Sequence, residues 1–191
     1  MEPYLPDLDK QLYYKYLDCA TNYFEFGSGG STYQACSKSN IKKIYAVESD
    51  LAWINKLKQH QFVKDNIENS RLHFEVVDLK CKPNTWGKPT ENVSHETKIK
   101  YPRSFNRIKP NDVDMIMIDG RFRAACALNV FSEIGDNTII FFDDFLNRPY
   151  YHIILKYYDI IDRASRAVVL KKKQVNIPAT EIIEKYEKDY R

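Results

Sequence analysis

Short apolar runs alternate along the chain with stretches of helical periodicity. Apolar runs that predict strands cover residues 23–26, 44–47, 73–77, 113–118, 138–142 and 167–171. Helical spacing of apolar residues predicts helices over 7–20, 32–39, 51–59, 123–134, 150–162 and 180–188. This alternation predicts an α/β fold, a doubly wound and mostly parallel sheet with helices on both faces of a single domain.

The alternation breaks at about residues 79–112, where prolines and aromatic residues are scattered among polar ones. A segment of this length inside a compact domain is usually a functional lid or an insertion, and we expect one here. Trp86, Lys88, Tyr101 and Arg103 suit a sugar ring or a stacked base. They equally suit a packed surface loop, and the pattern leaves both alternatives open.

A glycine and four acids stand at the ends of the first five predicted strands, where Gly27, Glu48, Asp78, Asp119 and Asp143 follow the apolar runs. In a parallel sheet these ends meet at one edge, which is where ligands bind in open α/β folds. We therefore expect the chemistry of this protein at that edge.

Composition narrows the class of protein. The 191 residues carry 29 basic and 26 acidic side chains, a net charge of +3, which is too balanced to indicate a nucleic-acid partner by itself, and none is expected. No apolar run is long enough to cross a membrane, and the N-terminus lacks a secretory pattern, so we expect a soluble, cytoplasmic protein. Cys19, Cys36, Cys81 and Cys126 are well separated and predict reduced thiols, mostly buried.

Three of only six glycines fall between residues 27 and 30, directly after the first predicted strand. A dinucleotide fingerprint would place glycine where Thr32 stands, and a phosphate-binding loop would need a lysine, so both interpretations fit poorly. Glu48 can accept hydrogen bonds from a ribose diol, and Asp78 from an adenine amine. The combination predicts a nucleoside bound without a pyrophosphate.

In these features the sequence resembles the class I S-adenosylmethionine-dependent methyltransferases, over about residues 20 to 145. The family's E-x-G-x-G motif matches Glu25, Gly27 and Gly29, and its acids after the second and third strands match Glu48 and Asp78. The resemblance implies a Rossmann-like methyltransferase domain that binds S-adenosyl-L-methionine. It implies cofactor contacts from Glu25, Gly27, Ser28, Gly29, Gly30, Ser31, Thr32, Glu48, Ser49, Asp78 and Asp119.

Asp119, Asp143 and Asp144 follow the fourth and fifth predicted strands. Three converging carboxylates repel one another unless a cation or protons intervene, and hard oxygen ligands suit Mg²⁺ or a similar divalent cation. The pattern resembles cation-dependent O-methyltransferases, and most of all the macrocin-type sugar O-methyltransferases. The alternative is that Asp143 or Asp144 caps the next helix while Asp119 touches the cofactor.

The predicted catalytic residues lie in the same region. A bound Mg²⁺ would lower the pKa of an acceptor hydroxyl, and Asp119 or Asp144 would take its proton. Arg121 would hold a carboxylate, phosphate or sugar hydroxyl of the acceptor. His152 is a second candidate base, although a lone histidine at a helix start is more often structural.

These observations predict an S-adenosylmethionine-dependent O-methyltransferase, assisted by a divalent cation, that acts on a sugar, a glycan or another small hydroxylated acceptor. A nucleic-acid methyltransferase that uses the lysines at 171–173, and a cofactor-binding protein without catalysis, remain as alternatives. Related enzymes are often dimers, which leaves a homodimer open. No membrane partner is expected.

Overall fold

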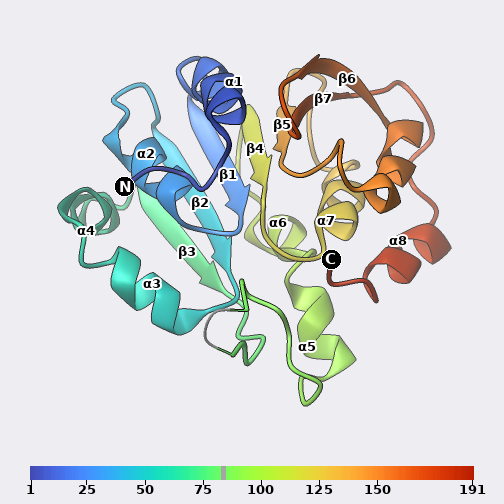
Figure 1. Cartoon of the computed structure of the whole chain (residues 1–191), viewed down its shortest axis with the longest axis horizontal. Coiled ribbons are helices and arrows are strands. Elements are labelled where there is room, and N and C mark those ends of the chain that lie inside the picture. Colours follow the sequence, from blue (N-terminus) through green and yellow to red (C-terminus); the bar gives the residue numbers. More distant parts are fainter. Residues whose placement is uncertain (83–84) are drawn as a thin grey trace.

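The computed structural model describes residues 1–82 and 85–191, and its centre is a seven-stranded sheet with the order β3-β2-β1-β4-β5-β7-β6 (Figure 1). Strands β1 to β5 run parallel, and β7 pairs antiparallel with both β5 and β6. The predicted doubly wound, mostly parallel sheet is therefore confirmed. The strands are β1 (Asn22–Phe26), β2 (Lys43–Glu48), β3 (Leu72–Val76), β4 (Met115–Ile118), β5 (Ile139–Phe142), β6 (Tyr158–Arg163) and β7 (Val168–Lys172).

Strand β1 is the middle one of the five parallel strands, and its residues 23–26 are buried. Phe26 pairs in register with Val47 of β2 on one side and Ile118 of β4 on the other. This register places the carboxyl ends of the three strands level with one another. The loops that follow them therefore start from one edge of the sheet.

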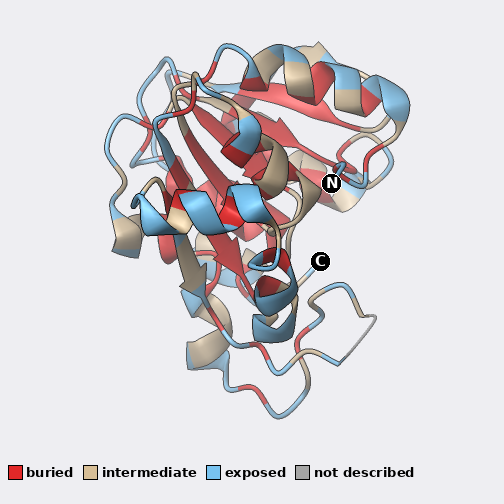
Figure 2. Ribbon diagram, turned by 90° about the vertical axis from the view of Figure 1, so that its left-hand side faces the viewer, coloured by how far each residue is buried: buried red, intermediate tan, exposed pale blue. Residues whose placement is uncertain are grey.

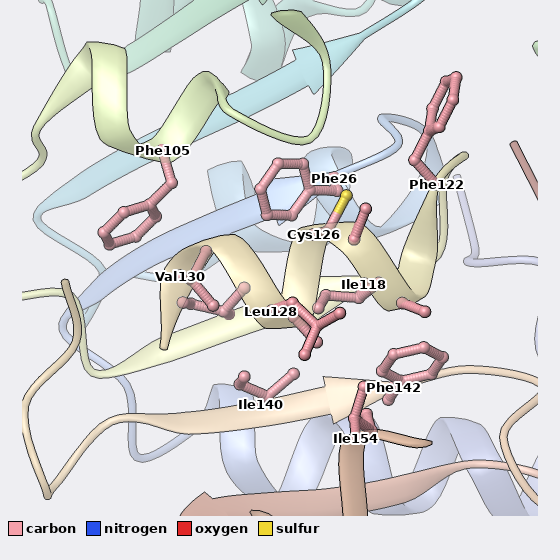
Figure 3. Close-up of a cluster of buried hydrophobic side chains, with 14 of the residues drawn as sticks. Phe26, Phe105, Ile118, Phe122, Cys126, Leu128, Val130, Ile140, Phe142 and Ile154 are labelled. Atoms are coloured by element: carbon pink, nitrogen blue, oxygen red, sulfur yellow. The ribbon is translucent and has the colours of Figure 1, made fainter. Parts of the chain in front are cut away.

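Helices cover both faces of the sheet, and two separate apolar clusters lie beneath them. On one face α1 (Asp7–Leu17), α2 (Gly30–Ser37) and α4 (Gln61–Glu68) pack against residues such as Tyr23 and Met117. On the other face α6 (Ser104–Ile108), α7 (Arg123–Val130) and the 3-10 helix η1 (Pro149–Lys156) pack against Phe26 and Phe142, as Figure 3 shows. In Figure 2 the inner strands of the sheet are mostly buried, whereas the edge strands β3 and β6 are largely not. The remaining helices are α3 (Leu51–Leu57), α5 (His95–Lys100) and α8 (Thr180–Tyr186).

The predicted helix over 150–162 is wrong in its second half. Residues 149–156 form η1, and β6 follows from Tyr158. Strand β6 forms an antiparallel hairpin with β7 that contains a register shift between Ile160 and Asp162. Pairing with a strand later in the chain decides the conformation here, and local periodicity does not report such pairing.

The segment from 79 to 112 contains more regular structure than its sequence pattern predicts. Helices α5 and α6 lie within it, and Tyr101 and Phe105 are buried in the apolar cluster under α7. Trp86 is exposed. Residues 83 and 84, which belong to the same predicted lid, lie outside the described residues.

Two further features are the state of the cysteines and the lengths of the helices. Cys36 and Cys126 are buried, Cys81 is half-buried and Cys19 is exposed, and all four are free thiols. In the described ranges, none of the helices combines the length and apolarity that crossing a bilayer requires.

Candidate functional site

Glu25 is the buried acid beneath the glycine loop. It is fully buried on β1, and its carboxylate accepts hydrogen bonds from the hydroxyls of Tyr23 (3.0 Å), Ser31 (2.6 Å) and Thr32. Burial raises the pKa of Glu25 from 4.5 to about 7, although the three hydroxyls oppose the shift. The carboxylate therefore ties β1 to the first turn of α2 and fixes the loop between them.

Gly27 brings the loop after β1 against the loop after β4. Its φ of +95° is in the region that favours glycine, and a Cβ there would lie 2.7 Å from the Cα of Gly120. The loop is supported from α3 as well, because the indole Nε1 of Trp53 donates to the Ser28 carbonyl (2.9 Å). The Gly29 amide donates to the Thr32 hydroxyl (2.8 Å).

Glu48, at the end of β2, turns its carboxylate toward this loop and is almost completely buried. Oε2 accepts from the amide and the hydroxyl of Ser28 (2.9 and 2.7 Å). Oε1 accepts from the amide and hydroxyl of Ser49 (2.6 and 3.1 Å) and from the Asp50 amide (3.0 Å). Two of these donors are serine hydroxyls, which can rotate away. The hydroxyls of a ribose diol can then donate to the carboxylate in their place, while the backbone amides still hold it.

Asp78, the predicted adenine contact, is exposed beyond the end of β3. Its carboxylate accepts from the amide (2.8 Å) and the ammonium (2.6 Å) of Lys80, and these bonds lower the pKa of Asp78. It lines an open pocket of about 530 Å³ together with Val77, Lys80 and Lys100. The pocket lies at the same sheet edge as Glu48, because the Val77 amide donates to the Glu48 carbonyl (2.9 Å).

The three aspartates predicted to bind a metal ion do converge, and Arg123 lies among them. Its Nη2 is 3.0 Å from Asp119 Oδ1, and its Nη1 is 3.5 Å from Asp143 Oδ2 and 3.4 Å from Asp144 Oδ2. The same guanidinium donates to the carbonyls of Gly120 (2.9 Å) and Asp143 (2.8 Å). A buried arginine therefore stands where the sequence pattern predicts a cation.

Two further arginines complete the neutralisation. Arg148 Nη2 is 2.6 Å from Asp144 Oδ2, and Arg166 Nε lies 3.2 Å from Asp143 Oδ1 and 3.1 Å from Asp144 Oδ1. The hairpin that carries Arg166 is held by Asp9, whose carboxylate accepts the amides of residues 165–167.

The predicted Mg²⁺ site is therefore not supported by these residues. Three guanidinium groups already balance the three carboxylates, so a divalent cation would meet like charge at close range. Across residues 1–82 and 85–191, no group of three or more histidine, cysteine, aspartate or glutamate side chains is arranged to hold a metal ion. The sequence pattern did not indicate that Arg123, Arg148 and Arg166 would neutralise these carboxylates.

Asp119 differs from the other two aspartates in its exposure. Its side chain is 30% exposed, against 3% for Asp143 and 7% for Asp144. Desolvation raises the pKa of Asp119 and Arg123 opposes this, while Asp143 and Asp144 raise it further. Asp119 is therefore the carboxylate of the three that an acceptor can reach, and its pKa is raised.

Arg121 and His152, the other predicted catalytic residues, lie in different settings. Arg121 is half-buried, and its guanidinium donates to the carbonyls of Thr85 and Trp86. His152 has its Nε2 3.0 Å from the Phe145 carbonyl oxygen, and its ring packs against Phe145. His152 thus packs against the loop after β5, whereas Arg121 lies at the sheet edge.

The N-terminal residues reach the same edge, which the sequence pattern did not indicate. A Cβ on Gly30 would lie 2.0 Å from the carbonyl oxygen of Glu2, so the glycine admits the N-terminal segment. Tyr4 then contacts Trp86, with ring centroids 5.3 Å apart. A Cβ on Gly87 would lie 2.5 Å from Ser49 Oγ, so the segment after Trp86 also approaches the loop after β2.

Two lysines of the basic run at 171–173 donate to backbone carbonyls on the hairpin side of the sheet. Lys172 donates to the Ile134 carbonyl (3.2 Å), and Lys173 to the Leu155 carbonyl (2.7 Å). These contacts lie away from the strand ends described above.

Comparison with known proteins identifies the fold. No protein-family model and no curated protein matches the sequence. Among solved structures, a methyltransferase-like protein from Silicibacter pomeroyi superposes with a TM-score of 0.82 at 22% identity, over 98% of this chain and 97% of that one. The chain has the class I methyltransferase fold.

More distant structures share this methyltransferase fold. The methyltransferase PaMTH1 of Podospora anserina, solved with S-adenosylhomocysteine, has a TM-score of 0.56 at 14% identity, over 87% of this chain and 78% of that one. The tRNA methyltransferase TrmK of Bacillus subtilis has a TM-score of 0.53 at 12% identity, over 90% and 68% of the two chains. At these identities the likeness concerns the fold, and the function must be argued from the site.

Proposed function

We propose that the protein is an S-adenosylmethionine-dependent methyltransferase that acts on a hydroxyl of a sugar or another small acceptor. The observation that carries this proposal is the joint placement of the Gly27–Thr32 loop and Glu48. They follow adjacent parallel strands, and Ser28 of the loop donates directly to the Glu48 carboxylate. The fold alone would not suffice, because many functions share it.

The residues at the strand ends fit the cofactor in chemical type. Glu25 holds the loop in place from below, and Glu48 offers a ribose diol two acceptor oxygens once the serine hydroxyls turn away. Asp78 and its pocket lie at the same sheet edge as Glu48, where the Asp78 carboxylate could accept from the adenine amine. When bound, S-adenosylmethionine supplies an activated methyl group on a sulfonium centre.

Asp119 is the residue that we expect to receive the acceptor's proton. Methylation of a hydroxyl releases a proton, and a carboxylate of raised pKa accepts it more readily than an ordinary one. Asp119 is next to Gly120, whose backbone contacts Gly27 of the glycine loop. The acceptor hydroxyl would therefore lie between this carboxylate and the loop.

No part of this proposal depends on a metal ion. Asp143 and Asp144 are buried and bound to Arg123, Arg148 and Arg166, and their role is to hold the loop after β5 in place. A carboxylate paired with a guanidinium is a poor ligand for Mg²⁺. Positioning and proton transfer by Asp119 are the contributions that the chain itself makes.

The test is formation of S-adenosylhomocysteine with a panel of free sugars, nucleotide sugars and small polyols, measured by mass spectrometry. We expect a methylated product from at least one acceptor. Asp119→Asn should lower the rate by about a hundredfold or more. Product from RNA or DNA, with none from any hydroxylated small molecule, would overturn the proposal.

A further inference from the structure

Arg121 is a half-buried cation that has no carboxylate within ion-pair distance in the described part of the chain. Its Nε donates to the carbonyl of Trp86 and its Nη2 to the carbonyl of Thr85, and each hydrogen bond is 2.8 Å long. A guanidinium has five N–H donors. Within residues 1–82 and 85–191, the other three donors of Arg121 have no protein acceptor.

The nearest charges do not compensate Arg121. Burial lowers the pKa of Arg121, and the adjacent Arg123 lowers it further. Arg123 is paired with its own three carboxylates, and these do not reach Arg121. A desolvated cation beside another cation is unfavourable, and a bound anion would remove the imbalance.

Other basic and aromatic groups lie around the same position. The Lys88 ammonium is 5.3 Å from the ring centre of Tyr190, and the Tyr190 carbonyl accepts the amide of Phe122, next to Arg121. The guanidinium of Arg191 lies 4.3 Å from the ring centre of Tyr150. Arg191 is itself paired with Asp189 (2.6 Å), so these contacts add Lys88 and aromatic rings to the neighbourhood of Arg121.

Its position relative to the proposed methyl-transfer site is equally specific. Arg121 is two residues beyond Asp119 and directly follows Gly120, which contacts Gly27. Its Cγ would lie 3.9 Å from a Cβ on Gly87, which itself approaches Ser49. Both Trp86 and Phe122 have positive φ (55° each), so the backbone on either side of the guanidinium is held in an unfavourable conformation.

We propose that Arg121 binds an anionic group, a phosphate or a carboxylate, on the acceptor whose hydroxyl is methylated. The planar guanidinium can form two parallel hydrogen bonds to either anion. This inference rests on the proposed function, because it names the class of acceptor for that site. The acceptor is then an acidic or phosphorylated hydroxyl compound.

The test follows the arginine Nε–H signals of the ¹⁵N-labelled protein by NMR, with S-adenosylhomocysteine present. Inorganic phosphate and acetate are titrated separately, which distinguishes a phosphate site from a carboxylate site. We expect the Arg121 signal, identified by its loss in Arg121→Lys, to shift saturably with at least one anion. The signal of Arg163, an exposed arginine on β6, should stay in place.

Variants then measure the strength of the contact. Arg121→Ala should weaken anion binding about tenfold to a hundredfold, Arg121→Lys should weaken it less, and Arg163→Ala should leave it unchanged. An Arg121 signal that moves no more than that of Arg163, or an Arg121→Ala variant with undiminished binding, would overturn the inference. Failure of the proposed function is a separate result, because S-adenosylhomocysteine would then cause no shift of the Ser28 and Gly29 amides.

Discussion

Replacing Glu25 by glutamine should change how the stability of this protein depends on pH. The carboxyl is completely buried, and burial raises its pKa from 4.5 to about 7. The folded state therefore binds a proton that the unfolded state releases between these two values. Stability from this group is fully present below about pH 4.5 and is lost as the pH rises through about 7.

The size of the effect follows from the shift. Each unit of pKa difference corresponds to about 1.4 kcal/mol, so the free energy of unfolding should fall by about 2–3 kcal/mol between about pH 5 and about pH 8 because of Glu25 alone. Glu25→Gln removes the titrating group while an amide oxygen remains to accept from Ser31 or Thr32. The free energy of unfolding of the wild-type protein should therefore fall relative to that of the variant as the pH rises.

Urea unfolding at several pH values measures this difference directly. Glu68→Gln is the matched control, since Glu68 is exposed at the end of α4. The control should follow the wild-type pH profile. If Glu25→Gln also follows that profile, Glu25 is not a buried acid of raised pKa, and the account of the loop would be refuted.

Three further predictions concern the loop and the arginine cluster. Gly27→Ala should reduce the free energy of unfolding, measured by calorimetry, by at least about 2 kcal/mol, because the φ of Gly27 is +95° and the added Cβ would meet Gly120. Gly135→Ala is the control and should change it little, since nothing lies within 4 Å of a Cβ there. Arg123→Ala should reduce it by about 3–5 kcal/mol in urea titrations, since Asp143 and Asp144 would lose a buried partner; a loss under 1 kcal/mol would contradict the ion-pair assignment. Mg²⁺ and a chelator should leave both the melting temperature and methyl transfer unchanged, and a Mg²⁺-dependent rise in either would restore the metal site.

The central sheet could be predicted because its strands are buried on both faces. Apolar runs such as 113–118 and 138–142 coincide with β4 and β5 to within two residues. Parallel strands of this kind are continuous in hydrophobicity and stand out in a single sequence. Strand β6 could not be found in this way, since Asp159, Ile160 and Ile161 are all exposed and its conformation depends on pairing with β7.

The placement of two parts of the candidate site could be predicted, because the glycine cluster and Glu48 follow adjacent parallel strands. A glycine cluster after a strand and an acid after the next strand, Glu48, predict a nucleoside site from spacing alone. The acidic cluster failed as a metal prediction because carboxylates can be neutralised by cations from anywhere in the chain. Arg148 lies only four residues after Asp144, but Arg166 is brought to Asp144 by tertiary folding, and Asp9 holds the hairpin that carries Arg166.

The central claim is that Glu48 and the glycine loop bind S-adenosylmethionine, and calorimetric titration with S-adenosylhomocysteine tests it most directly. The wild-type protein should bind, and Glu48→Ala should reduce the affinity at least tenfold, because the two acceptor oxygens for the ribose are lost. Glu133→Ala, an exposed acid in the turn before β5 and so at the opposite edge of the sheet, should bind as the wild type does. No binding to the wild-type protein, or equal binding to Glu48→Ala, would contradict the account.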